Sequence, residues 1–310
     1  MHVFITGASG GIGLRLTKLL LSHGHTVTGL ARSEASADKI SAAGAKVLRG
    51  TITDLDVLAQ GAGEADAAVH TAFPNPTTGV DWIQVCAEDR AATEAIANAL
   101  ANGSSTLDKS KRIFINTGGM LGNLGDEEAG KIPTPATPRY LTEELTTALS
   151  KSLGIRTYNV RLPPVTHHAG MMHPFIGGMI LAAKKLGFSP YVGEGTAHWP
   201  AVHYDDAARM YLNILESDPT KVPTSVPVHP IQDRAIANKQ FAELIGKKLG
   251  LEVKSLSPDI AMQHLGFIAM IAQFDVPASG EKSEKWFNWK PTEQGLLEEL
   301  EASDLDIWKS

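Results

Sequence analysis

Short apolar runs alternate with longer segments of helical periodicity over the first half of the chain. The apolar runs lack a polar face, which indicates strands buried on both sides in a parallel sheet. We expect strands at residues 3–5, 25–31, 47–48, 66–70, 112–116 and 156–162. The intervening helices are expected at residues 11–23, 33–43, 54–60, 81–101 and 139–153. This alternation predicts an α/β fold with a Rossmann-like, doubly wound parallel sheet.

The second half of the chain is expected to be mainly helical, with turns around Tyr191 and Trp199. Helices are expected at residues 174–186, 204–215, 235–249, 258–274 and 291–301, and one more strand at residues 226–231. We therefore expect a dinucleotide-binding domain over residues 1–165, completed by a return segment at about 203–231. A smaller, mainly helical C-terminal lobe for the substrate is expected over residues 166–202 and 232–310.

A glycine-rich turn follows the first expected strand directly. Gly7, Gly10 and Gly13 have the spacing G-x-x-G-x-x-G, which allows a tight turn, close approach to a pyrophosphate and close packing of helix on strand. The next helix directs its free N–H groups and positive dipole end at that phosphate. A plain loop can also contain three glycines, but the strand before and the helix after are what a dinucleotide site requires. The turn therefore predicts cofactor contacts from Gly7, Ser9, Gly10, Gly11, Ile12 and Gly13.

Composition narrows the classes of protein that fit. Of the 310 residues, 43% are hydrophobic and 20% charged, as in an ordinary globular enzyme with a large core. The formal net charge of −6, with no basic stripe, argues against nucleic acid or an anionic membrane as a partner. Cys86 is the only cysteine, which excludes an intrachain disulfide and a cysteine-rich zinc site. With an N-terminal apolar run too short for a signal peptide, this predicts a cytoplasmic protein.

Four stretches carry a resemblance to a known family. They are Thr6-Gly-Ala-Ser-Gly-Gly-Ile-Gly13, Val69-His-Thr-Ala72, Arg161-Leu-Pro-Pro164 and Trp199-Pro-Ala-Val-His-Tyr-Asp-Asp-Ala207. Over nearly its whole length the chain resembles the short-chain dehydrogenase/reductase superfamily, in its extended and atypical branches, which include NAD(P)-dependent epimerase/dehydratase-like proteins. The resemblance implies an NAD(P) cofactor. It also implies that Thr71 and Ala72 lie beside the ribose and that Thr117, Pro163 and Val165 lie near the nicotinamide.

The residues after the second expected strand bear on the choice between NADP and NAD. An NAD site needs a carboxylate there, about 20 residues past the glycines, to accept hydrogen bonds from the ribose 2′-OH. This chain has no acid until Glu34, and Arg32 and Ser33 before it can hold a 2′-phosphate. Gly29 is expected to leave room for that larger group. The sequence therefore favours NADP (NADPH), with the alternative that Arg32 is a solvated loop cation.

The residues that support hydride transfer in related reductases are only partly present. The resemblance implies a Ser or Thr after the fifth strand and a Tyr-x-x-x-Lys pair, in which lysine lowers the tyrosine pKa and tyrosine protonates the substrate. Thr117 and Tyr140 are the catalytic candidates, but the lysine position is then Glu144. Shifted by one residue, the pair becomes Arg139 and Glu143. Without a lysine, Tyr140 is expected to act as a hydrogen-bond donor or acid rather than as a base.

Substrate contacts are expected on the loops after the strands, where folds of this kind bind ligands. The candidates are Phe73, Met120, His167, His168 and Trp199, with the segment at residues 167–175 over the substrate. Apolar residues of this half of the chain also fit a core role, namely Met171, Met172, Met179, Trp199, Met262, Phe267 and Met270. The Gly- and Pro-rich stretch at residues 117–138 is long for a loop and predicts a lid.

Histidines concentrate in the same region, at positions 167, 168, 173, 198 and 203. There is no H-E-x-x-H motif and no cysteine partner. We therefore expect no metal site, but packing by His203 and pocket lining by His167 or His168. The whole pattern predicts an NADPH-dependent reductase that transfers hydride to a small, largely apolar carbonyl, enone or imine. The missing lysine leaves two alternatives, a non-redox isomerase or cyclase and an NADP-binding sensor protein.

Overall fold

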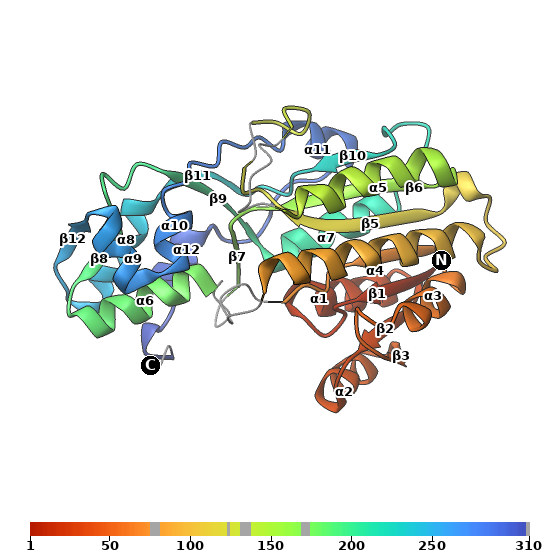
Figure 1. Ribbon diagram of the computed structural model, residues 1–310, viewed down its shortest axis with the longest axis horizontal. Helices are drawn as coiled ribbons and strands as arrows, with labels where there is room; N and C mark the ends of the chain where they lie inside the picture. Colours follow the sequence, from red (N-terminus) through yellow and green to blue (C-terminus); the bar gives the residue numbers. More distant parts are fainter. Residues whose placement is uncertain (75–80, 123–124, 131–137, 169–173, 308–310) are drawn as a thin grey trace.

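A parallel sheet of seven strands forms the larger part of the molecule, in the order β10-β6-β5-β4-β1-β2-β3 (Figure 1). The computed structural model describes residues 1–74, 81–122, 125–130, 138–168 and 174–307. The strands of this sheet are β1 (His2–Thr6), β2 (Thr26–Ala31), β3 (Lys46–Arg49), β4 (Ala67–His70), β5 (Ile113–Gly119), β6 (Arg156–Leu162) and β10 (Val226–Val228). The predicted Rossmann-like, doubly wound sheet is confirmed.

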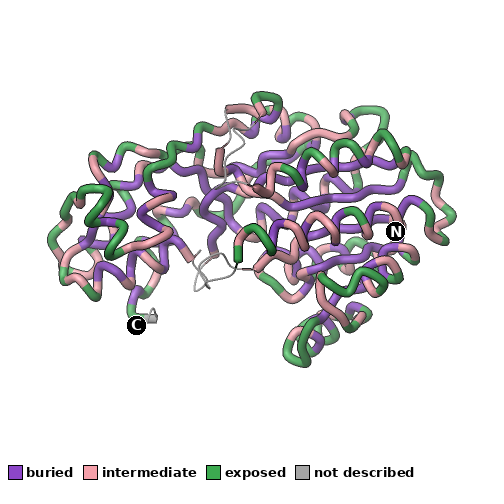
Figure 2. The backbone as a smooth tube through the Cα atoms, viewed as in Figure 1, coloured by how far each residue is buried: buried purple, intermediate pink, exposed green. Residues whose placement is uncertain are grey.

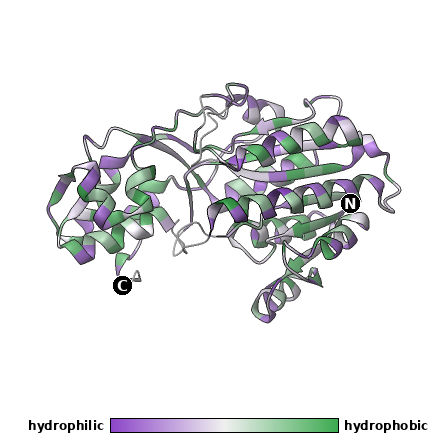
Figure 3. Ribbon diagram, in the orientation of Figure 1, coloured by the Kyte–Doolittle hydropathy of each residue, from purple (hydrophilic) through white to green (hydrophobic). Residues whose placement is uncertain are grey.

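Helices cover both faces of this sheet because its strands are apolar on both sides. In β1, Val3 and Ile5 pack on one face with α1, α2 and α7, whereas Phe4 packs on the other with α3 and α4. The purple centre of Figure 2 and the green strands of Figure 3 show this buried, apolar layer. The helices are α1 (Gly11–Ser22), α2 (Glu34–Ala42), α3 (Leu55–Gly63), α4 (Trp82–Asn102), α5 (Tyr140–Leu153) and α7 (Tyr204–Leu215), with a short 3-10 turn at Lys109–Lys111.

The C-terminal lobe has its own core, and it contains more strands than expected. Strands β7 (Val165–His167), β9 (His198–His203) and β11 (Asp233–Ala237) form a sheet of order β11-β9-β7, which lies between the large sheet and the helices of the lobe (Figure 1). A parallel pair joins β8 (Ser189–Val192) to β12 (Val253–Leu256). The helices are α6 (Pro174–Leu186), α8 (Asn238–Leu249), α9 (Pro258–Leu265), α10 (Phe267–Ile271), α11 (Glu281–Trp286) and α12 (Leu296–Ala302), followed by a 3-10 turn at Leu305–Ile307.

Several expected boundaries in this half of the chain are wrong. The strands β7, β8, β9, β11 and β12 were not expected, because each is short and pairs with a segment distant in sequence. The helix expected at 258–274 is interrupted at Gly266, whose φ of +53° breaks the helical backbone. The helix expected at 291–301 begins only at Leu296, because the N–H groups of Thr292 and Glu293 bind the Asp206 carboxylate instead.

Two smaller features complete the fold. Asp54 stands at the N-cap position of α3, but its carboxylate accepts the Thr51 N–H at 2.7 Å rather than a helix N–H. In the parts of the chain that are described, no helix is both long and apolar enough to cross a membrane.

Candidate functional site

The turn after β1 is shaped by glycines that a side chain would disrupt. Gly7 has a φ of +73°, and a Cβ on it would lie 2.6 Å from Thr71 Oγ1 and 2.8 Å from Ala72 N. A Cβ on Gly13 would lie 2.1 Å from the Gly7 carbonyl oxygen. The N-cap residue Gly10 has no side chain to accept the first N–H groups of α1. The first N–H groups of α1 therefore have no side-chain cap, as a phosphate site at the N-terminus of a helix requires.

The end of β4 is bonded to β1 beside this turn. Thr71 Oγ1 donates to the Thr6 carbonyl at 2.7 Å, and Ala72 N donates to Thr6 Oγ1 at 3.3 Å. The Tyr204 ring on α7 lies 3.0 Å from the position that a Cβ on Gly11 would take. The glycine turn, the end of β4 and the Tyr204 ring thus meet at the carboxyl ends of β1 and β4. This is the switch point of the sheet, where such folds bind ligands.

Arg32 and Ser33 lie at the end of β2, as the sequence places them. Ser33 is the N-cap of α2 and its hydroxyl accepts from Ser36 N at 3.3 Å. The next residue, Glu34, pairs with Arg49 at 2.6 Å. Arg32 is exposed and has no carboxylate partner among the described residues. A free cation therefore stands beside a helix N-terminus at this edge of the sheet.

Gly29 does not leave room for a phosphate, and this expectation is wrong. A Cβ at Gly29 would lie 2.7 Å from Ala8 Cβ and 3.0 Å from Ile40 Cγ2. Both neighbours belong to the buried layer beneath α1 and α2. The missing side chain of Gly29 is needed for close packing of β2, and its space is filled by protein.

The helix after β5 shows which register faces the sheet. Glu143 is buried, and Arg161 on β6 donates from Nε to its Oε1 at 2.6 Å. Glu144 is exposed, and Tyr140 at the start of α5 is half-buried. The pair that faces the sheet at a spacing of four residues is therefore Arg139 and Glu143. Glu144, at the lysine position of the register that begins at Tyr140, is exposed.

The Arg139 guanidinium lies over the carboxyl ends of β4 and β5. Its Cζ is 3.6 Å from the centroid of the Phe73 ring, and its Nη2 donates to the Thr117 carbonyl. The same Nη2 is 3.5 Å from Asp89 Oδ1. Asp89 is fully buried on α4, and His70 Nε2 lies 3.3 Å from it. Burial opposes the charge of Asp89, but Arg139 and His70 outweigh burial and hold the pKa of Asp89 below its usual value.

The Thr117 hydroxyl is engaged on the opposite face of the sheet. Thr117 is buried, and its Oγ1 lies 2.8 Å from the Tyr211 hydroxyl on α7. Tyr211 is also fully buried, and burial raises its pKa above the usual value. The Thr117 side chain thus bonds to the core in this conformation, and its carbonyl is the group that contacts Arg139.

The expected substrate residues divide into two groups. Phe73 and His168 are partly exposed. Met120, His167 and Trp199 are buried, and Trp199 Nε1 donates to the Phe274 carbonyl at 3.2 Å. Pro163 and Val165 are also buried at the end of β6 and the start of β7. Trp199 therefore packs the core of the C-terminal lobe, in agreement with its alternative interpretation, and is not a pocket wall. Met171, Met172 and His173 lie outside the described residues.

Glu299 on α12 joins two of the histidines. Its Oε2 lies 2.5 Å from His167 Nδ1 and its Oε1 lies 3.5 Å from His203 Nε2. His168, His203 and Asp205 are also near enough to hold a metal ion, with ligand atoms within 4.8 Å of one another. However, His203 Nδ1 accepts the Asp205 N–H at 3.2 Å, and Arg15 Nε binds the Asp205 carboxylate at 2.8 Å. Protein groups already bind the His203 nitrogen and the Asp205 carboxylate that would hold the ion, so we propose no metal here.

The described part of the expected lid is anchored to α11. Glu127 is fully buried, and its Oε1 accepts from both the N–H and the hydroxyl of Ser283 at 2.6 Å. Lys282 binds Asp126 at 2.8 Å and also binds Glu128. Residues 125–130 are therefore held on the C-terminal segment by a buried carboxylate and surface ion pairs.

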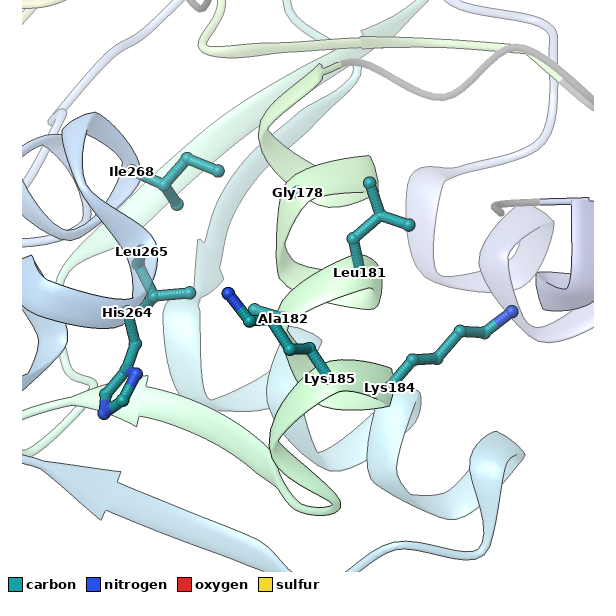
Figure 4. A pocket seen from close by; sticks show the side chains of 8 residues that line it. All are labelled: Gly178, Leu181, Ala182, Lys184, Lys185, His264, Leu265 and Ile268. Atoms are coloured by element: carbon teal, nitrogen blue, oxygen red, sulfur yellow. The ribbon is translucent and has the colours of Figure 1, made fainter. Parts of the chain in front are cut away.

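A groove in the C-terminal lobe lies apart from these strand ends, between α6 and α9–α10 (Figure 4). It has a volume of about 490 Å³, and apolar and lysine side chains both line it. It is lined by Gly178, Leu181, Ala182, Lys184, Lys185, His264, Leu265 and Ile268. Lys184 Nζ donates to the Leu305 carbonyl at 2.6 Å, so one lining residue also holds the segment after α12.

Sequence reasoning missed several polar residues of the site, notably Asp89, His70, Tyr211 and Glu299. Asp89 left one signal, because it interrupts the apolar stripe of α4 between Cys86 and Thr93. A carboxylate in a stripe that faces a core needs a partner. The partner itself, Arg139, is 50 residues away and was not predictable from the stripe.

The fold and the glycine turn together define a dinucleotide-binding protein of the Rossmann type. The chain belongs to the NAD dependent epimerase/dehydratase family, which matches residues 3–226. An uncharacterized protein of Schizosaccharomyces pombe is 37% identical, over 98% of this chain and 99% of the relative. The sterol-4-alpha-carboxylate 3-dehydrogenase, decarboxylating, of Dictyostelium discoideum is 27% identical, over 67% of this chain and 65% of that protein. The fold is similar to that of UDP-glucuronic acid 4-epimerase from Bacillus cereus, with a TM-score of 0.72, 18% identity and 99% of each chain covered.

Proposed function

We propose that this protein is an NADPH-dependent oxidoreductase that reduces a small, largely apolar carbonyl, enone or imine. The observation that carries the cofactor assignment is Arg32, which is exposed and has no carboxylate partner among the described residues. It lies at the end of β2 beside the N-terminus of α2, and no acid precedes Glu34 there. A guanidinium suits a 2′-phosphate, and the carboxylate that an NAD ribose requires is absent from this position.

The residues present fit a dinucleotide. Gly7 and Gly13 let the turn fold tightly against Thr71 and against itself, which a Cβ at either position would prevent. The first N–H groups of α1 have no side-chain cap and suit the pyrophosphate. Arg32 and Ser33 hold the 2′-phosphate, and Thr71 and Ala72 lie on the ribose side. The bound cofactor supplies hydride. The dehydrogenase name of the Dictyostelium relative supports redox chemistry for this chain too.

Fluorescence titration with NADPH and NADH tests the cofactor assignment. We expect the unaltered protein to bind NADPH more tightly, and Arg32→Gln to lose most of that preference while NADH affinity stays the same. Arg234→Gln is a matched control, because Arg234 is an exposed arginine of the C-terminal lobe, paired with Glu281. Equal affinity for NADPH and NADH in the unaltered protein excludes the assignment of Arg32.

Turnover is tested separately, by NADPH consumption with a panel of carbonyl, enone and imine acceptors. The bond between Thr117 and Tyr211 favours one alternative, an NADP-binding sensor, because it engages the expected catalytic hydroxyl within the core. Tight NADPH binding without consumption of any acceptor supports that alternative.

A further inference from the structure

Arg139 has donors that no described residue accepts. Its Nη2 binds the Thr117 carbonyl and lies 3.5 Å from Asp89. Its Nε is buried without a hydrogen-bond partner, and Nη1 makes no hydrogen bond to any described residue. The side chain is 19% exposed. An arginine with such donors at the carboxyl ends of the strands, where folds of this kind bind ligands, is suited to bind an oxygen atom that carries negative charge.

The guanidinium is also fixed in place before any ligand binds. Phe73 packs against it from the segment after β4, and Thr117 receives one of its N–H groups at the end of β5. The buried Asp89 lies next to Nη2. A preorganised donor of this kind stabilises charge that develops in a transition state without a cost of reorganisation.

We propose that Arg139 binds the oxyanion formed on the substrate and that the substrate is a conjugated enone rather than an isolated carbonyl or an imine. This inference rests on the proposed NADPH-dependent reduction. Of the three classes of acceptor, the enone is the one that suits a permanently charged side chain that does not donate a proton.

Arginine stays protonated in proteins, so it stabilises an oxyanion but is a poor donor of a proton. Reduction of an isolated carbonyl leaves an alkoxide, which needs a proton on oxygen at once. An imine accepts hydride best as an iminium cation, which the charge of Arg139 repels. An enolate, in contrast, persists on a hydrogen-bond donor until its carbon is protonated.

The step balances as a conjugate reduction. The β-carbon of the enone gains hydride from NADPH, the C=C pair moves to form the enolate double bond, and the carbonyl pair moves to oxygen at Arg139. Water then gives a proton to the α-carbon as the enolate closes back to the carbonyl. Proton donation by water leaves a hydroxide ion, which solvent neutralises, so the net products are the saturated ketone and NADP⁺ with one proton consumed.

A phenolate measures the oxyanion site independently of turnover, because it resembles an enolate in charge and shape. With NADP⁺ present, we expect 4-nitrophenol to bind as the phenolate, visible in its absorption spectrum. Arg139→Gln is expected to weaken this binding roughly 10- to 100-fold, the usual range for a hydrogen bond to a charged group. Arg139→Lys retains part of the affinity, and Arg234→Gln retains all of it. Equal phenolate affinity in the unaltered protein and Arg139→Gln overturns the proposal.

Arg139→Gln leaves Asp89 buried without its partner, so this variant risks poor folding. The double variant Arg139→Gln/Asp89→Asn removes both charges, so it tests the proposal even if the single variant does not fold. It is expected to show the same loss of phenolate binding with native-like NADPH binding.

The acceptor is tested with matched compounds, 2-cyclohexenone, cyclohexanone and 1-pyrroline. With NADPH deuterated at the transferred position, we expect consumption of the enone alone and deuterium on its β-carbon. Faster reduction of cyclohexanone or 1-pyrroline, or deuterium on the carbonyl carbon, overturns the enone assignment while the proposed reductase function survives. Failure of NADPH to bind at all contradicts the proposed function, whereas the phenolate titration without cofactor still reports on Arg139.

Discussion

Arg161 on β6 donates from Nε to Glu143 Oε1 on α5 over 2.6 Å, and both residues are buried. This pair fixes the rotation of α5 about its axis, because a buried carboxylate and a buried guanidinium must remain in contact. The rotation in turn places Arg139, four residues earlier, over the ends of β4 and β5. Arg139 thus contacts the Thr117 carbonyl beside Asp89 at these strand ends.

Glu143→Gln is expected to lower the free energy of unfolding by about 3 to 5 kcal/mol, because it removes the charge of the buried carboxylate that Arg161 binds. Urea unfolding followed by tryptophan fluorescence measures the change. The neighbouring substitution Glu144→Gln is the control and is expected to change stability by about 0.5 kcal/mol or less, because Glu144 is exposed. A larger effect of Glu144→Gln than of Glu143→Gln would show that the other register faces the sheet.

Gly29→Ala is expected to destabilise the protein by about 1 to 3 kcal/mol, as overpacking of a core usually does. The added Cβ would lie 2.7 Å from Ala8 Cβ. Gly63→Ala on α3 is a suitable comparison, because its Cβ would meet only the Ala99 carbonyl, at 3.8 Å. Chemical denaturation of both variants checks this. If Gly29→Ala left stability unchanged but weakened NADPH binding, the expectation that Gly29 makes room for the 2′-phosphate would be correct after all.

The contact of Glu299 with His203 is expected to stabilise the fold most between about pH 5 and pH 6.5. Burial opposes the charge of Glu299, but hydrogen bonds from His167 and His203 outweigh it and lower the Glu299 pKa to about 2. Burial also opposes the charge of His203, but Glu299 outweighs it and raises the His203 pKa above 6.5.

The stability that charged His203 adds to the fold is fully present below its unfolded pKa. This stability is lost as pH rises through the raised pKa of His203 in the folded protein. The contribution of Glu299 is complete above its unfolded pKa, near 4.5, and is lost as pH falls toward 2. Glu299→Gln should therefore lower the melting temperature more at about pH 5.5 than at about pH 9. Thermal melts at both pH values measure this, with the exposed Glu298→Gln as control. A decrease that is equal at both values would argue against the charge interaction.

Cys86 is expected to react with a thiol reagent only when the protein opens. The side chain is fully buried, and burial raises the pKa of its thiol to about 11. At about pH 8 the native protein should therefore react slowly, and protein in denaturant quickly, because the thiolate is the nucleophile. Absorbance with a chromogenic disulfide measures both rates. Rapid labelling of the native protein would contradict this burial.

The sequence predicted the features that depend on neighbours along the chain. Alternating apolar runs and helical segments indicated the parallel sheet, and the glycine spacing indicated the turn, because both follow from local backbone geometry. The weaker predictions came from the C-terminal half. There, β8 and β12 are each four residues long and pair across more than sixty residues of chain, which no local pattern reports.

By itself, then, the sequence determined a glycine turn between a buried strand and a helix, an arginine where an NAD site needs an acid, and the absence of a Tyr-x-x-x-Lys pair. Only the tertiary structure decided that Arg139 and Glu143 face the sheet, that Gly29 is filled by Ala8 and Ile40, and that Trp199 is core. The physical reason is that these roles depend on partners brought together by folding. Glu299 and His167, in contact across 132 positions of sequence, show how far apart such partners lie.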